Sequence, residues 1–229
     1  MRICRLYFIT VIMLLLVVGS VSADNWFSTI FGQSKGVKGS DDLVTEERDV
    51  KPFNKIVTSG AYDITVVVGE KQSVKITFDD NLVEIVQTEV KGKTLRIFSD
   101  KSYRSQHDCL IEITVPELKE VVAKGSGDIV IENLKGDFFE YDLRGSGDVE
   151  LGGEVDELEI NLAGSGDIDA RNLIAKDAFV AIRGSGDVRV YASDSFDGAV
   201  YGSGDIDFYG NPDNVSKHIA GSGSIKRRR

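Results

Sequence analysis

The sequence predicts an all-β protein built as a right-handed parallel β-helix, a solenoid with coils of about 19 residues and an N-terminal β-rich cap. The first observation behind this is a repeat: GSGD or a close variant occurs six times, with leading glycines at positions 125, 145, 164, 184, 202 and 221. The second is parity, because even offsets from each leading glycine are apolar and odd offsets are mostly polar. The third is that residues 53–225 contain no helical period.

The first 51 residues predict export followed by a linker. Residues 1–23 have two arginines, an apolar run LYFITVIMLLLVVG and small residues up to Ala23, as in a cleaved signal peptide. A retained membrane anchor is the alternative, but the apolar run is short for a span. We therefore expect a protein of the periplasm or the cell surface, without a membrane span after cleavage. Residues 24–51 are polar and are predicted to be a linker.

Short segments with period two follow the linker and predict strands at 61–70, 73–80, 94–100 and 109–118. They are rich in Val, Ile, Thr and Phe and are separated by turn sequences such as VKGK. We expect them to cap the coils. The β-helical domain as a whole is predicted over residues 52–225, with GSGD repeats from 124 and a basic tail at 226–229.

The apolar offsets predict the core of the repeats. Two residues before the leading glycines lie Ala123, Leu143, Leu162, Ile182, Val200 and Ile219, and four residues after them lie Ile129, Val149, Ile168, Val188, Ile206 and Ile225. Each strand should pair in parallel with its equivalent one coil on, and the crossover preference gives the right hand. A β-sandwich of hairpins is the alternative, but it would not need identical residues at this period. Ala178 is small and its neighbour Phe179 has the opposite parity, which predicts a local irregularity.

Both glycines of each motif fall on the inward parity. Either an inward side chain would collide there, or the backbone needs a positive φ, and glycine meets both demands. A degenerate first copy of the motif is predicted at Ser59–Ile64, which reads SGAYDI.

The serines and aspartates of the motifs face outward and should form two rows. The candidate ligand-facing row is Ser126, Ser146, Ser165, Ser185 and Ser203, and the candidate calcium row is Asp128, Asp148, Asp167, Asp187 and Asp205. Carboxylates about 4.8 Å apart repel by roughly 0.9 kcal/mol in water, so something must offset the repulsion. We expect turn amides to do so, with calcium as the alternative. Lys124, Arg144 and Arg183 are further candidates for neutralising the row.

Other chemistry is sparse. The net charge of -10 argues against nucleic-acid partners, and the basic tail is expected to block edge-to-edge growth of the stack. His107 and His218 are the two histidines and have no evident metal or nucleophile partner in the sequence. Cys109 is predicted to be a small buried residue rather than a reactive thiol. No catalytic residue or cofactor is predicted.

The export signal, the segment FNKIVTSGAYDITVVVGEKQSVKI, the junction LIEITVPELKEVVAKGSGDI and the repeated GSGD-[IV] together resemble the bacterial putative auto-transporter adhesin, head GIN domain family. The resemblance spans about residues 53–225 and implies an exported β-helical domain that binds a cell-surface or envelope glycan or protein. A non-enzymatic interaction module is therefore expected. A β-helical polysaccharide-active enzyme and a self-assembling spacer are the alternatives.

Overall fold

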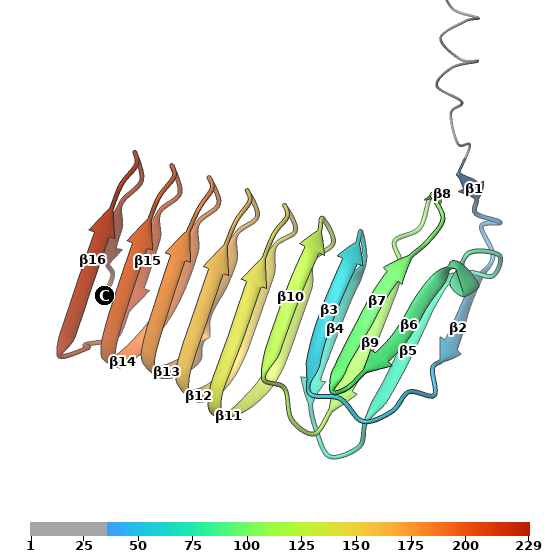
Figure 1. Cartoon of the computed structure of the whole chain (residues 1–229), viewed down its shortest axis with the longest axis horizontal. Helices are drawn as coiled ribbons and strands as arrows, with labels where there is room; N and C mark the ends of the chain where they lie inside the picture. Colours follow the sequence, from blue (N-terminus) through green and yellow to red (C-terminus); the bar gives the residue numbers. More distant parts are fainter. Residues whose placement is uncertain (1–35) are drawn as a thin grey trace, which may run out of the picture. The chain divides into compact units, whose positions relative to one another are not determined.

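The computed structural model describes residues 36–229, which form an all-β domain as predicted (Figure 1). One 3-10 helix, η1 (Val83–Ile85), is the helix found in this part of the chain. The strands are β1 (Val37–Lys38), β2 (Leu43–Glu47), β3 (Lys55–Gly60), β4 (Asp63–Val68), β5 (Ser73–Asp79), β6 (Val86–Lys91), β7 (Thr94–Ser99), β8 (Tyr103–Arg104), β9 (Leu110–Val115), β10 (Glu120–Gly125), β11 (Ile129–Leu143), β12 (Val149–Leu162), β13 (Ile168–Ile182), β14 (Val188–Val200), β15 (Ile206–Tyr209), β16 (Asn214–Ile219) and β17 (Ile225–Arg227).

Fifteen of the strands form one mixed sheet. From β10 to β17 every pairing is parallel and joins one repeat to the next, as in β11–β12, β12–β13 and β13–β14. Three antiparallel pairings, β2–β5, β5–β9 and β6–β7, lie ahead of the repeats. The expected parallel pairing therefore holds for the repeats, whereas the segment that precedes them is mixed.

Each long strand from β11 to β14 takes part in two ladders, and its register with the next strand shifts between the two parts, in β11 between Ile131 and Leu134. The first part of β11 pairs with β4 and its last part pairs with β10. The first ladder contains β2, β5, β9, β4, the first parts of β11–β14, β15 and β17, and the second contains β6, β7, β3, β10, the last parts of β11–β14 and β16. Figure 1 shows the two ladders running one behind the other along the domain.

The core lies between the two ladders and is lined by the apolar positions predicted from parity. Side chains such as Ile129, Leu143 and Ile182 are almost fully buried in one continuous cluster. The expected irregularity is present, since the register shifts between Ala175 and Asp177 and Phe179 is 40% exposed. Val215 and Ile219 keep the inward parity but are each 46% exposed, because β16 is the last strand of its ladder.

The two ends of the described chain are attached to the domain. Residues 36–51, predicted as part of a linker, contain β1 and β2, and β2 pairs with β5. The basic tail begins in β17, where the Arg228 guanidinium lies 2.9 Å from the Asp207 carboxylate and Arg227 Nε donates to the Gly210 carbonyl oxygen. The predicted signal peptide, 1–23, lies outside the described residues. Within 36–229 no helix has the length and apolarity needed to cross a membrane.

Candidate functional site: the GSGD corner

The motif glycines pack directly against the preceding repeat. A Cβ built on Gly125 would lie 1.8 Å from the carbonyl oxygen of Gly60, and a Cβ on Gly164 would lie 1.9 Å from that of Gly145. The second glycines meet the same obstacle, with Gly166 at 2.1 Å from the Gly147 carbonyl oxygen. None of the motif glycines from 125 to 223 has a positive φ. Of the two predicted reasons for glycine, collision is therefore the one that applies, and the obstacle is the neighbouring backbone.

The aspartates of the motif form a hydrogen-bonded ladder. The backbone N–H of each aspartate donates to the carboxylate of the aspartate one repeat earlier, for example from Asp148 to Asp128 Oδ1 at 2.8 Å and from Asp167 to Asp148 Oδ1 at 2.9 Å. The same bond continues through Asp187 and Asp205 and ends at Ser224, whose N–H and hydroxyl both donate to Asp205 Oδ1. These are the turn amides expected from the sequence.

The degenerate first copy at Ser59–Ile64 is part of this ladder. Gly60 pairs in register with Gly125, and the Asp128 N–H donates to Asp63 Oδ1 at 3.0 Å. Tyr62 takes the place of the second glycine and is 2% exposed, so its ring fills the core where later repeats have only backbone. The Asp row therefore starts one repeat earlier than the GSGD spelling indicates.

The two arginines proposed to neutralise the row contact other residues, whereas no contact in the described chain tests the proposal for Lys124. Arg144 pairs with Asp142, and the Arg183 guanidinium lies over the Tyr201 ring at 5.4 Å from its centroid. Within residues 36–229, the ion pair found with the row is that of Lys226, at 3.9 Å from Asp205 Oδ2. The prediction is wrong for the two arginines, because closer partners lie beside them on the outer face.

The serines alternate with the aspartates on the outside and are all exposed. Their backbone N–H groups are used, as in Ser146 donating to the Gly125 carbonyl oxygen at 3.0 Å and Ser165 to that of Gly145 at 3.0 Å. Their hydroxyls, in contrast, form no hydrogen bond to another residue in the described range 36–229. We call these serine and aspartate rows the GSGD corner. Each repeat presents there one hydroxyl without a partner in residues 36–229 and one carboxylate of which one oxygen accepts a backbone N–H.

Comparison with known sequences places the chain in a family. The sequence pattern of the putative auto-transporter adhesin, head GIN domain family matches residues 52–212. The chain belongs to this family. No curated protein matches the chain.

Solved structures agree with this assignment of the head GIN domain. A putative adhesin from Bacteroides fragilis is 31% identical, has a TM-score of 0.67, and covers 84% of this chain and 100% of its own. A putative lipid-binding protein from Parabacteroides distasonis is 27% identical with a TM-score of 0.51, over 84% of this chain and 99% of its own. A putative adhesin from Parabacteroides merdae, 21% identical with a TM-score of 0.56 over 84% and 99%, shares the fold.

A second feature of this head GIN domain is an acidic column on the outer face of the second ladder. Glu120, Glu140 and Glu159 occupy equivalent positions on β10, β11 and β12. Lys55 pairs with Glu120 at one end of the column. Burial raises the pKa of the Glu140 carboxyl, and the neighbouring Glu159, Glu120 and Asp142 carboxylates add to the increase. Ionised Glu140 is therefore destabilised in the folded domain.

We expect Glu140→Gln to stabilise the head GIN domain at pH 7. The folded state holds the Glu140 proton more tightly than the unfolded chain, so stability is lost as the pH rises above the ordinary glutamate pKa. The gain at pH 7 should be on the order of 0.5 kcal/mol and should vanish at pH 3, where glutamate is protonated in both states. Urea unfolding at the two pH values measures this. The exposed Glu132→Gln is the control, and a Glu140→Gln variant less stable than wild type at pH 7 would contradict the expectation.

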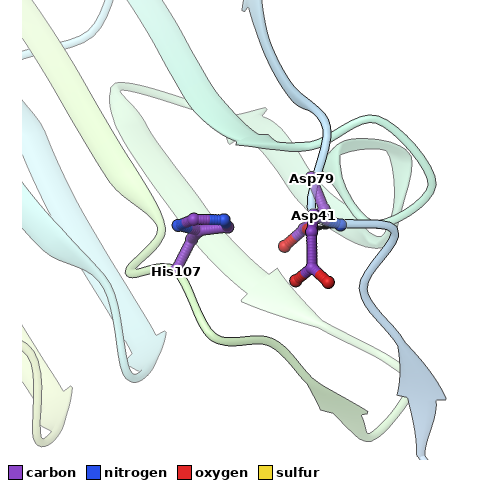
Figure 2. A group of neighbouring side chains, drawn as sticks. All are labelled: Asp41, Asp79 and His107. Atoms are coloured by element: carbon purple, nitrogen blue, oxygen red, sulfur yellow. Dashed lines mark hydrogen bonds between the residues drawn. The ribbon is translucent and has the colours of Figure 1, made fainter.

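A third feature, missed in the sequence, brings His107 together with two aspartates. One ligand atom from each of Asp41, Asp79 and His107 lies within 4.8 Å of the other two. Figure 2 shows the imidazole on one side and the two carboxylates on the other. The three residues come from the turn before β2, the end of β5 and the loop before β9. Sequence separations of 38 and 28 residues left no local signal of this cluster.

Cys109 follows this loop and is 2% exposed, as predicted for a buried residue. Burial, and secondly the Asp63 carboxylate, raise the pKa of the Cys109 thiol to about 12. The nucleophilic thiolate is therefore scarce at neutral pH, in agreement with a packing role.

Proposed function

We propose that this head GIN domain is an exported, non-enzymatic binding module that contacts a glycan or a protein of the cell surface or envelope through the GSGD corner. The observation that carries the proposal is the row of exposed serine hydroxyls without partners in residues 36–229, one in each repeat. Solved relatives described as putative adhesins support an adhesive role by analogy. Export rests on the predicted signal peptide.

The repetition of the corner favours a ligand that is itself repetitive or extended. Neighbouring strands of a sheet lie about 4.8 Å apart, so successive hydroxyls meet a ligand at regular intervals. Weak contacts of this kind add up when they are presented on one rigid body. We further propose that the repeats wind as a right-handed parallel β-helix, which is supported by the parallel register of each repeat on the next.

The aspartate row is proposed to hold the repeats in register, and calcium remains the alternative. Each carboxylate already accepts a backbone N–H from the next repeat. Calcium takes six to eight oxygen ligands, whereas the row supplies one motif carboxylate per repeat, and one oxygen of each already accepts a backbone N–H. The hydrogen bonds therefore offset the repulsion between neighbouring aspartates without requiring an ion.

Binding to immobilised envelope polysaccharides and to intact bacterial cells tests the proposal. A Ser165→Ala/Ser185→Ala variant should bind at least about tenfold more weakly than wild type, because two adjacent contacts of a multivalent surface are lost. A Ser102→Ala/Ser216→Ala variant, changed at exposed serines off the row, is the matched control. Equal binding by all three proteins, or none by wild type, would contradict the proposal.

Three further measurements address the alternatives. We expect equal binding in calcium and in chelator, and loss of binding in chelator would favour a calcium row. Release of products from acidic polysaccharides, abolished by a single Asp→Asn change in the row, would favour an enzyme. Self-association in light scattering without ligand binding would favour a spacer.

A further inference from the structure

We propose that Asp41, Asp79 and His107 bind a divalent transition-metal ion, with zinc as the best-fitting ion. Two carboxylate oxygens and one imidazole nitrogen lie within 4.8 Å of one another (Figure 2). Ligand atoms bound to one zinc ion at roughly 2.0–2.2 Å lie about 3.4 Å apart, so the exposed Asp41 and His107 side chains would move inward on binding. This site lies apart from the GSGD corner, so its existence does not depend on the proposed function.

The second observation that points to a cation is the burial of Asp79. Its side chain is 0% exposed, yet it forms no ion pair with a basic side chain anywhere in residues 36–229. Buried charges in proteins are normally hydrogen-bonded and also paired or bound to metal, and Asp79 has hydrogen bonds from Ser105 and Asp41 but no cation beside it among the described residues. Asp41 adds a second negative charge beside it, so the cluster has two carboxylates and a divalent ion would balance them.

Hydrogen bonds to both oxygens hold the Asp79 carboxylate in place. The Ser105 hydroxyl donates to Asp79 Oδ2 at 2.5 Å, and the Asp41 backbone N–H donates to Oδ1 at 2.7 Å. The His107 backbone N–H in turn donates to Ser105 Oγ at 2.8 Å, which fixes the loop that carries the imidazole. Hydrogen-bonded outer partners of this kind are typical of ligating carboxylates, and each carboxylate oxygen keeps a second lone pair for the ion.

The donor set selects the kind of ion. Zinc accepts nitrogen and carboxylate oxygen in a four-coordinate site, and three protein ligands with water in the fourth position is a common arrangement. Asp41 and His107 are exposed, so water can reach the fourth position and an ion can enter. Calcium and magnesium prefer oxygen-only sets with more ligands, and they would gain little from the imidazole.

The bound ion would fasten three separate segments to one another. Asp41 belongs to the chain that leads into the domain, Asp79 ends β5, and His107 lies between β8 and β9. Gly39 is already packed on Asp79, since a Cβ there would lie 2.7 Å from the carboxylate. Metal binding should therefore stabilise the folded domain by mass action and fix the entry of the chain at this end.

Calorimetry and thermal melting of the purified chain without a histidine tag test the site, with zinc chloride as the probe. We expect one zinc ion per chain and a higher melting temperature with zinc than with chelator. His107→Gln and Asp41→Asn change exposed side chains and should weaken zinc binding at least about 100-fold, since even loss of outer partners costs about 10–100-fold. His218→Gln, at the other histidine of the chain, is the matched control and should bind like wild type.

Three results would overturn the proposal. The first is no saturable zinc binding by the folded wild type. The second is zinc binding that His107→Gln leaves intact. Binding that only Asp41→Asn weakens would belong here too, because it would indicate an oxygen-only site such as one for calcium. The third is equal loss of binding in His107→Gln and His218→Gln, which would mean non-specific capture by surface histidines. A shift of the His107 ring resonances on addition of zinc, with the His218 resonances unmoved, gives a second readout that does not depend on stability.

Discussion

A Gly164→Ala variant is expected to lose at least about 4 kcal/mol of folding stability, or to fail to fold. The new Cβ would lie 1.9 Å from the Gly145 carbonyl oxygen, and this obstacle is backbone inside a parallel ladder that cannot move by a rotamer change. Relief would require the two repeats to separate, which would break the neighbouring hydrogen bonds of the GSGD corner. Urea unfolding followed by circular dichroism measures the loss.

Gly152→Ala is the matched control for this substitution. Gly152 also lies in a repeat, but a Cβ there would come no closer than 3.8 Å to its neighbours and its φ is not positive. We expect a change within about 1 kcal/mol. If Gly164→Ala were as mild as the control, close approach of the backbones could not be the reason for the motif glycines.

A Phe139→Ala variant should lose about 3–5 kcal/mol, the usual cost of removing a buried phenylalanine ring. Phe139 is 0% exposed and lies 6.5 Å from the Tyr141 ring, so its removal leaves a cavity between the ladders. Alternation along β11 makes the adjacent residue its control, because Phe138 points outward and is 36% exposed. Phe138→Ala should cost less than about 1 kcal/mol.

Thermal melting and urea unfolding of the two variants measure the difference. Equal losses in both would mean that the parity of β11, and with it the division into inward and outward faces, is wrong. Wild-type-like stability in Phe139→Ala would mean that Phe139 does not pack in the core.

The repeats could be predicted in detail because their physics is local and recurs. A period of 18 to 20 residues and a two-residue alternation fix which side chains meet and which face each takes, and Ile129, Leu143 and Ile182 lie in the core accordingly. Even the first copy at Ser59–Ile64 could be recognised, although 65 residues separate Gly60 from Gly125.

The rest could not be predicted because it depends on contacts that do not repeat. The antiparallel pairings of β2 with β5 and of β6 with β7 join segments without a shared motif. The approach of Asp41, Asp79 and His107 depends on how those segments meet. The sequence also could not distinguish collision from a positive φ as the reason for the motif glycines. Parity places these glycines inside, but it does not say which atom lies opposite each of them.

The ladder of aspartates makes the repeats interchangeable. Each rung offers one carboxylate to the rung after it and one N–H to the rung before it, and each motif glycine meets the same carbonyl oxygen of the preceding rung. If one whole repeat were removed, the two rungs brought together would still match at every one of these points. Adding or removing a whole repeat would therefore change the length of the corner and keep its chemistry.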